Sequence, residues 1–227
     1  VSFAMAARTI VFDLDGTLAD TSADLIAAAN WCFEDLGHGA VLDPTADAAT
    51  ALRGGRAMLT LGFSRVDTGA GAAEIDRQYP RLLAAYADCI DRETTIYPGA
   101  VDAIEALRGQ GWHTAIFTNK PEGLAETLMQ RLGVRDLFGS LVGADTLATR
   151  KPNAAPYVAS VERAGGSVAR SLLIGDTVTD RDTARAAGVP VALVTFGPAG
   201  GDMAALKPDA LLSRYDDLPG LAETLVP

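Results

Sequence analysis

The hydrophobic positions of the chain fall into short runs that alternate with amphipathic segments. The run TIVFD (9–13) is almost wholly apolar and rich in β-branched and aromatic residues, so it predicts a strand that is buried on both faces. Similar runs recur along the chain. The predicted strands cover residues 9–13, 113–118, 171–176 and 190–196, with weaker ones at 140–144 and 209–213.

Between these runs, apolar residues recur at helical spacing and stop at glycine, as in GLAETLMQRLG (123–133). The same pattern predicts helices at 156–166 and 180–188, and residues 97–111 belong to this part of the chain as well. Strands that alternate with helices are typical of a parallel sheet with helices on both faces. We therefore expect an α/β protein with a doubly wound, Rossmann-like parallel sheet.

Residues 19–92 interrupt the alternation. Helical spacing runs through them, with Ala-rich segments at 22–36 and 74–92, and no run among them predicts a strand. Because the stretch follows the first strand directly, we expect a helical cap domain (19–92) inserted into an α/β core formed by residues 1–18 and 93–227. The cap is expected over the C-terminal edge of the sheet.

Composition narrows the possible functions. The 227 residues are 48% hydrophobic, which suits a well-packed core, and the net charge of −10 argues against nucleic-acid binding. Two cysteines, Cys32 and Cys89, are too few for a disulfide framework. No segment is apolar enough to span a membrane, and the N-terminal VSFAMAARTI does not resemble a signal peptide. We expect a cytoplasmic protein, monomeric or homodimeric, without membrane partners.

Two carboxylates stand at the end of the first predicted strand. Asp13 ends the apolar run, and Asp15 follows two residues later, before Gly16 and Thr17. Ligands of doubly wound sheets bind beyond the carboxyl ends of the strands, so both carboxylates are expected at a ligand site. Gly16 permits a sharp turn, and Thr17 can begin the next helix. The alternative is that both aspartates only cap that helix.

Three further segments place polar side chains at the ends of other strands or before helices. Thr118 and Asn119 follow the strand at 113–118, and Lys151, one of three lysines, precedes a helix. Asp176 ends another strand, and Asp180 follows one helical turn later. Each has a simpler interpretation, as a helix cap or a solvated lysine, but four such segments in this order favour one site.

This set of side chains favours phosphoryl transfer. The carboxylates of Asp13, Asp176 and Asp180 are hard oxygen ligands that suit Mg²⁺, and the cation would offset their repulsion. Asp13 is then the nucleophile that forms an aspartyl-phosphate. Asp15 acts as general acid and then as general base. Thr118 and Lys151 are expected to hold the phosphoryl group and neutralise its charge.

The segments DLDGTLADT, FTNK, KPNAAP and GDTVTD resemble the four motifs of the haloacid dehalogenase superfamily, over residues 8 to about 198. DLDGTLADTSADLIAAAN and IFTNKPEGLAETLMQRLGV look most like phosphoglycolate phosphatases. The resemblance implies that Mg²⁺ contacts Asp13, Asp176 and the backbone carbonyl of Asp15. It implies that Asp180 supports Lys151 or the water shell of the metal. The third motif departs from the family, because Asn153 and Ala154 stand where His and Pro are common.

Relatives with other chemistry fit less well. Dehalogenases of this superfamily lack an acid at the position of Asp15, and residues 19–92 contain no lysine for a phosphonatase-type Schiff base. Leu25 stands where related phosphomutases carry a histidine. A signalling receiver domain would lack the helical insertion. A binding module without turnover stays an alternative, as does a phosphatase of a sugar phosphate, a nucleotide or pyrophosphate.

The predicted cap holds a candidate specificity loop. In ALRGGRAML (51–59), Gly54 and Gly55 stand between Arg53 and Arg56, ahead of a helical segment. Backbone N–H groups of a Gly-rich turn and two guanidinium groups would bind a carboxylate on a small substrate, with 2-phosphoglycolate as the leading candidate. The alternative is a plain helix–helix turn with solvated arginines.

Overall fold

The structure is a computed structural model and describes residues 7–66, 69, 71–198, 200 and 202–227. The first six residues, on which the expectation about a signal peptide partly depends, lie outside the described residues. The chain divides into two units. The α/β unit comprises the residues up to Ala19 and those from Ile96 onward, and the helical unit comprises Asp20–Thr95.

A six-stranded parallel sheet forms the centre of the α/β unit, in the order β5-β4-β1-β6-β7-β8. The chain moves outward from β1 to β4 and β5, then returns to the other side of β1 with β6. The strand order therefore reverses between β1 and β6, the switch point at which doubly wound sheets bind ligands. The strands are β1 (Thr9–Phe12), β4 (His113–Phe117), β5 (Ser140–Val142), β6 (Ser171–Gly175), β7 (Val191–Val194) and β8 (Ala210–Leu212).

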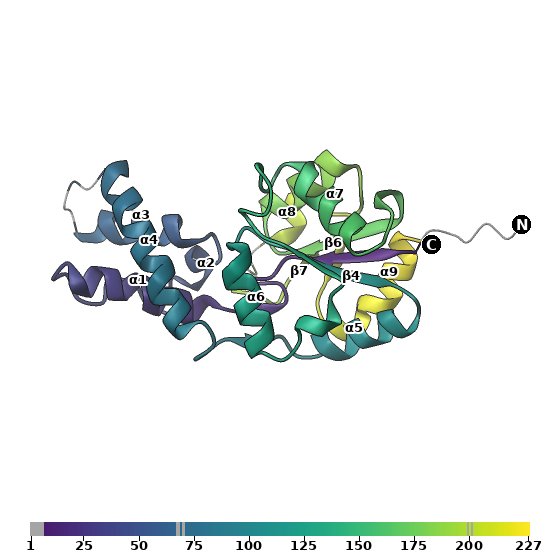
Figure 1. The fold of residues 1–227 in the computed structure, drawn as a ribbon, viewed down its shortest axis with the longest axis horizontal. Helices are drawn as coiled ribbons and strands as arrows, with labels where there is room; N and C mark the ends of the chain where they lie inside the picture. The colour runs from purple at the N-terminus through teal and green to yellow at the C-terminus, as the bar shows by residue number, and fades with distance from the viewer. Residues whose placement is uncertain (1–6, 67–68, 70, 199, 201) are drawn as a thin grey trace, which may run out of the picture. The chain divides into compact units, whose positions relative to one another are not determined.

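Helices cover both faces of this sheet (Figure 1). α7 and α8 pack together on one face, and α5 and α9 pack together on the other. The helices of this unit are α5 (Ala100–Gly109), α6 (Glu122–Arg131), α7 (Ala154–Arg163), α8 (Val178–Ala187) and α9 (Leu218–Leu225). Side chains of the strands and of α7 and α8 form a fully buried core, including Val11, Phe117, Tyr157, Val161, Leu173 and Ala184. The predicted fold class is confirmed, including both weaker strands.

The helical unit is built on α1, which packs against α4 and α3. Phe33 of α1 and Phe63 of α3 pack edge to face with their ring centroids 5.1 Å apart, and both are buried. Arg65 forms two 2.6 Å hydrogen bonds with the carboxylate of buried Asp47, which fixes the end of α3. The helices are α1 (Ser22–Asp35), α2 (Ala48–Ala51), α3 (Gly55–Val66) and α4 (Ala72–Cys89).

Two short strands lie where the chain passes between the units. β2 (Ala19–Asp20) pairs with β3 (Thr95–Ile96) in a two-stranded sheet. β2 falls inside the stretch that was expected to contain helices only, because a strand of two residues leaves no hydrophobic pattern to detect. The division of the units at residues 20 and 95 differs from the expected 19 and 92 by one and three residues.

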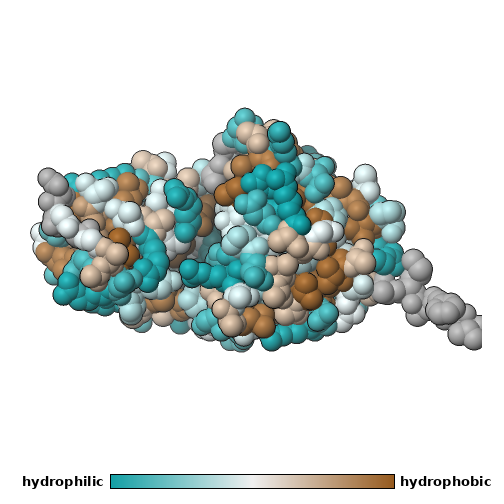
Figure 2. Space-filling model, turned by 90° about the horizontal axis from the view of Figure 1, so that it is seen from above, coloured by the Kyte–Doolittle hydropathy of each residue, from teal (hydrophilic) through white to brown (hydrophobic). Residues whose placement is uncertain are grey.

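The surface mixes hydrophilic and hydrophobic residues on the face shown in Figure 2. Among the residues that the structure describes, the exposed large apolar side chains are those of Trp31, Leu36, Val178 and Leu211. Within the described residues, none of the helices combines the length and the hydropathy needed to cross a bilayer.

Candidate active site

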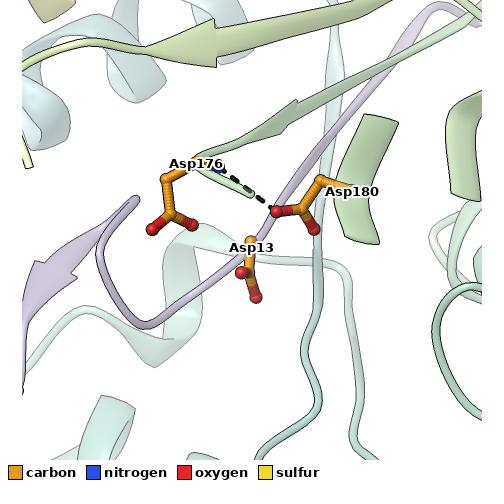
Figure 3. A group of neighbouring side chains, drawn as sticks. All are labelled: Asp13, Asp176 and Asp180. Atoms are coloured by element: carbon orange, nitrogen blue, oxygen red, sulfur yellow. Dashed lines mark hydrogen bonds between the residues drawn. The ribbon is translucent and has the colours of Figure 1, made fainter. Parts of the chain in front are cut away.

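Three aspartates gather at the switch point of the sheet. Asp13 directly follows β1, Asp176 directly follows β6, and Asp180 lies in the first turn of α8 (Figure 3). One carboxylate oxygen of each lies within 4.8 Å of the others, and all three residues are buried. The parallel pairing of β1 with β6 explains this convergence, because it brings residues that are 163 positions apart to one edge.

The turn after β1 fixes Asp13 and Asp15. The Asp13 Oδ1 atom accepts a 2.7 Å hydrogen bond from the Leu14 N–H, and Gly16 adopts a φ of 80°, which favours glycine. The sequence suggested that Thr17 begins a helix, and the structure shows that it does not. The chain first forms this turn and β2, and α1 starts only at Ser22. The Thr17 hydroxyl instead donates a 3.1 Å hydrogen bond to Asp176 Oδ1.

Lys151 links the nucleophile candidate to α8. Its Nζ lies 2.8 Å from Asp13 Oδ1 and 2.7 Å from Asp180 Oδ1, and its side chain is only 2% exposed. The solvated lysine of the alternative interpretation is therefore excluded. Burial alone would lower the pKa of Lys151, but the Asp13 and Asp180 carboxylates outweigh that effect and raise it. Lys151 is thus a fixed positive charge within the cluster.

Burial has the opposite effect on the aspartates. It raises the pKa of Asp13 from 3.8 to about 7, against the lowering effect of Lys151, and Asp180 adds repulsion. The pKa of Asp176 is also raised well above its ordinary value, first by burial and then by the charges of Asp13 and Asp180. The ionised forms of Asp13 and Asp176 are therefore unfavourable in this cluster, and a cation would stabilise them.

The donor set fits a hard divalent cation. Asp176 Oδ2 is buried and has no hydrogen-bond partner among the described residues, whereas Oδ1 is held by Thr17. A buried carboxylate oxygen without a partner is unfavourable, and carboxylates are the ligands that Mg²⁺ prefers. Asp13 and Asp176 can therefore contribute oxygens to such an ion.

Asp180 has a different environment. Its Oδ1 accepts from Lys151 Nζ, and its Oδ2 accepts from the N–H groups of Asp176 and Thr177 and from the Thr177 hydroxyl. Thr177 and Asp180 form a capping box at the start of α8, so the simpler capping interpretation holds for part of this side chain. Because both oxygens are engaged, the geometry favours Asp180 as the anchor of Lys151 over direct metal ligation.

The segment after β4 contributes Lys120, which no sequence pattern indicated as a site residue. Thr118 is buried, Asn119 is exposed, and the Thr118 hydroxyl oxygen accepts a 3.1 Å hydrogen bond from the Lys120 N–H. Lys120 is buried as well, and its Nζ lies 2.8 Å from Asp15 Oδ1. The motif FTNK contains this lysine, but its spacing gives no sign that the side chain turns inward.

Tyr215 is a second buried residue that no sequence pattern indicated. Its hydroxyl donates a 2.6 Å hydrogen bond to the backbone carbonyl of Thr17, 198 positions away in the chain. Since Thr17 holds Asp176 Oδ1, Tyr215 supports the turn that orients this carboxylate.

The residues of the candidate specificity loop lie at the start of α3. Gly54 has a φ of 97°, and Gly55 begins the helix where an added Cβ would lie 3.0 Å from the Tyr79 ring. Arg56 forms a 2.6 Å ion pair with Asp76 and stacks over Tyr79 at 4.8 Å. Arg53 is exposed, and no residue in the described part of the chain forms an ion pair with it. The two arginines therefore differ in their availability to a ligand.

Comparisons with known proteins agree with this geometry. Residues 10–194 match the family model described as haloacid dehalogenase-like hydrolase. A phosphoglycolate phosphatase of Agrobacterium fabrum is 38% identical over 219 residues, which cover 95% of this chain and 93% of that protein. One of Mesorhizobium japonicum is 37% identical over 223 residues, 98% of each chain.

A solved structure shares the fold. The crystal structure of a predicted phosphoglycolate phosphatase from Haemophilus somnus 129pt superposes with a TM-score of 0.83 at 23% identity, and the match covers 96% of this chain and 99% of that chain. The family model and these relatives each match most of the chain. The chain belongs to the haloacid dehalogenase-like hydrolase family.

Proposed function

We propose that the protein is a Mg²⁺-dependent phosphatase that hydrolyses a small phosphomonoester, with 2-phosphoglycolate as the leading substrate. The observation that carries the proposal is the pair formed by Asp13 and Lys151 at the switch point, 2.8 Å apart, beside the unpartnered oxygen of Asp176. Curated relatives named phosphoglycolate phosphatase, 35–38% identical over more than nine-tenths of this chain, support the substrate.

The side chains divide the reaction into two steps. A carboxylate oxygen of Asp13 attacks phosphorus, and the bond from phosphorus to the leaving oxygen breaks while Asp15 donates its proton to that oxygen. A water molecule then attacks the aspartyl-phosphate, Asp15 takes a proton from the water, and inorganic phosphate leaves. Lys151 neutralises charge on the transferred group, and Thr118 and Asn119 would hold its oxygens.

Asp13, Asp176 and the backbone carbonyl of Asp15 would hold the metal. When bound, Mg²⁺ supplies positive charge that keeps the carboxylates ionised and stabilises the phosphoryl oxygens. Asp180 acts indirectly, because it holds Lys151 and the first turn of α8 in place.

A substrate screen tests the proposal. Purified protein is assayed for release of inorganic phosphate from phosphoglycolate, sugar phosphates, nucleotides and pyrophosphate, with Mg²⁺ and after complete chelation. We expect turnover only with Mg²⁺, fastest with phosphoglycolate, and a phosphoenzyme after rapid acid quench.

Asp13→Asn is the decisive variant. It should keep the fold, judged by circular dichroism, and lose the phosphoenzyme together with turnover. Activity within tenfold of the parent would refute Asp13 as the nucleophile. Full activity in metal-free buffer would refute the metal requirement. A faster rate on another ester would make that ester, in place of phosphoglycolate, the leading substrate.

A further inference from the structure

Lys120 is a buried cation that the proposed reaction does not use. It is 6% exposed, and its Nζ forms an ion pair with Asp15 Oδ1 at 2.8 Å. The backbone around it is held on both sides, since its N–H donates to the Thr118 hydroxyl and its carbonyl accepts a 2.9 Å hydrogen bond from the Ala144 N–H. The side chain therefore starts from a fixed point after β4.

The two buried lysines serve different aspartates. Lys151 contacts Asp13 and Asp180, whereas Lys120 contacts Asp15, so the nucleophile and the acid–base candidate each face their own ammonium group. The third lysine, Lys207, lies at the end of a 3₁₀ turn (Met203–Leu206), outside this cluster. A buried ion pair contributes little to stability on balance, because desolvation offsets the attraction. A role in orienting Asp15 accounts better for a lysine at this place.

We propose that Lys120 is a positioning residue for Asp15. By holding Oδ1, it orients the carboxyl group so that Oδ2 carries the proton to the leaving oxygen, and later takes a proton from the attacking water. Lys120 keeps its own proton in both steps. The inference rests on the proposed function, since it requires Asp15 to act as the general acid and base.

This role predicts a dependence on the leaving group. An alkyl phosphate needs the acid, because its alkoxide is strongly basic, whereas p-nitrophenyl phosphate has a weakly basic leaving group and needs it little. The specificity constant kcat/KM reports the first step only, from free enzyme to phosphoenzyme. A residue that acts through the acid should therefore matter for alkyl phosphates and not for the aryl phosphate.

The experiment measures kcat/KM for phosphoglycolate, ethyl phosphate and p-nitrophenyl phosphate. The variants are Lys120→Met, Lys120→Arg, Asp15→Asn and the double variant. We expect Lys120→Met to lose about 10²-fold on both alkyl phosphates, the size typical of a misplaced catalytic group, and less than threefold on the aryl phosphate. Lys120→Arg should recover part of the loss. In the Asp15→Asn background, Lys120→Met should cost nothing further.

The outcomes separate this role from others. Equal loss on all three substrates would overturn the inference, because Lys120 would then support the site or the phosphoryl group in general. Loss confined to phosphoglycolate would also overturn it, since Lys120 would then bind the substrate carboxylate. If Asp15→Asn itself shows no dependence on the leaving group, the acid role in the proposed function fails instead.

Folding does not block the test. Lys120→Met leaves the partly buried carboxylate of Asp15 without its cation, so each variant is checked by circular dichroism and thermal unfolding. If the single variant does not fold, the comparison of Asp15→Asn with Asp15→Asn/Lys120→Met still applies, because the double variant lacks both charges of the pair and leaves no carboxylate without its cation. A further loss from Lys120→Met in that background would show a role independent of Asp15.

Discussion

At the scale of single residues, the site assigns separate tasks to the two oxygens of one carboxylate. Asp176 Oδ1 is held by Thr17, which Tyr215 supports in turn, and Oδ2 is left for a cation. Asp180 shows the opposite arrangement, with both oxygens engaged by protein groups. Identical residue types in one cluster thus do different work, and only their hydrogen bonds distinguish them.

Ion pairs also distinguish Arg53 from Arg56, since Arg56 is paired with Asp76 and Arg53 is exposed. We expect Arg53→Ala to lower kcat/KM for phosphoglycolate by about 10- to 150-fold, because a lost charged hydrogen bond costs ~1.5–3 kcal/mol at 1.36 kcal/mol per decade. Ethyl phosphate, which lacks the carboxylate, should be almost unaffected. Arg56→Ala should show the same selective loss only if Arg56 leaves Asp76 to meet the substrate.

Asp76→Ala is the matched control for Arg56. It removes the same ion pair but keeps the guanidinium group, so selectivity for phosphoglycolate should persist. Equal loss on both substrates from either arginine variant would mean that the loop supports the helical unit alone. No loss on either substrate would leave both arginines as solvated residues.

At the scale of elements, the packing of α1 against α3 depends on Gly62. An added Cβ would lie 2.1 Å from the Phe33 ring, which is fully buried. We expect Gly62→Ala to lower the free energy of unfolding by about 1–3 kcal/mol through overpacking, although alanine favours a helix. Thermal unfolding measures the loss, and hydrogen exchange should place it in α1 and α3.

Gly123→Ala is the control for this substitution. Gly123 lies exposed in α6, and an added Cβ would meet nothing within 4 Å. The change should be neutral or raise the free energy of unfolding by about 0.4–1 kcal/mol. If Gly62→Ala behaved in the same way, Phe33 would not be fixed as described.

The elements also show how far the sequence could predict the site. All six strands of the sheet were predictable, because each is an apolar run, and the aspartates at their ends followed from the topology. The role of Lys120 was not predictable, because a lysine after a strand leaves the same sequence pattern whether its side chain faces water or Asp15, which lies 105 positions away. The segment predicted at 22–36 agrees with α1, but the role of Thr17 at a helix start was wrong, because a threonine suits a helix cap and a turn equally well.

At the scale of the whole molecule, the acid cluster links stability to pH. The net charge is −10, and the site adds buried carboxylates to a surface that is already acidic. Burial raises the pKa of Asp13 from 3.8 to about 7, so between these pH values the folded protein binds a proton that the unfolded chain has released. Without metal, the contribution of Asp13 to stability is therefore greatest below pH 4 and declines as pH rises towards 7.

The decline of this stability contribution with rising pH can be measured. In metal-free buffer, the free energy of unfolding of the parent minus that of Asp13→Asn should fall by up to about 1.4 kcal/mol per pH unit between pH 4 and 7, then level off. Carboxylates with a lowered pKa, such as Asp47, act in the opposite direction but are common to both proteins and cancel. Asp176 titrates together with Asp13, so the slope belongs to the cluster. Saturating Mg²⁺ should flatten the difference, because a cation favours the ionised carboxylates, and a difference that is independent of pH without metal would contradict the raised pKa.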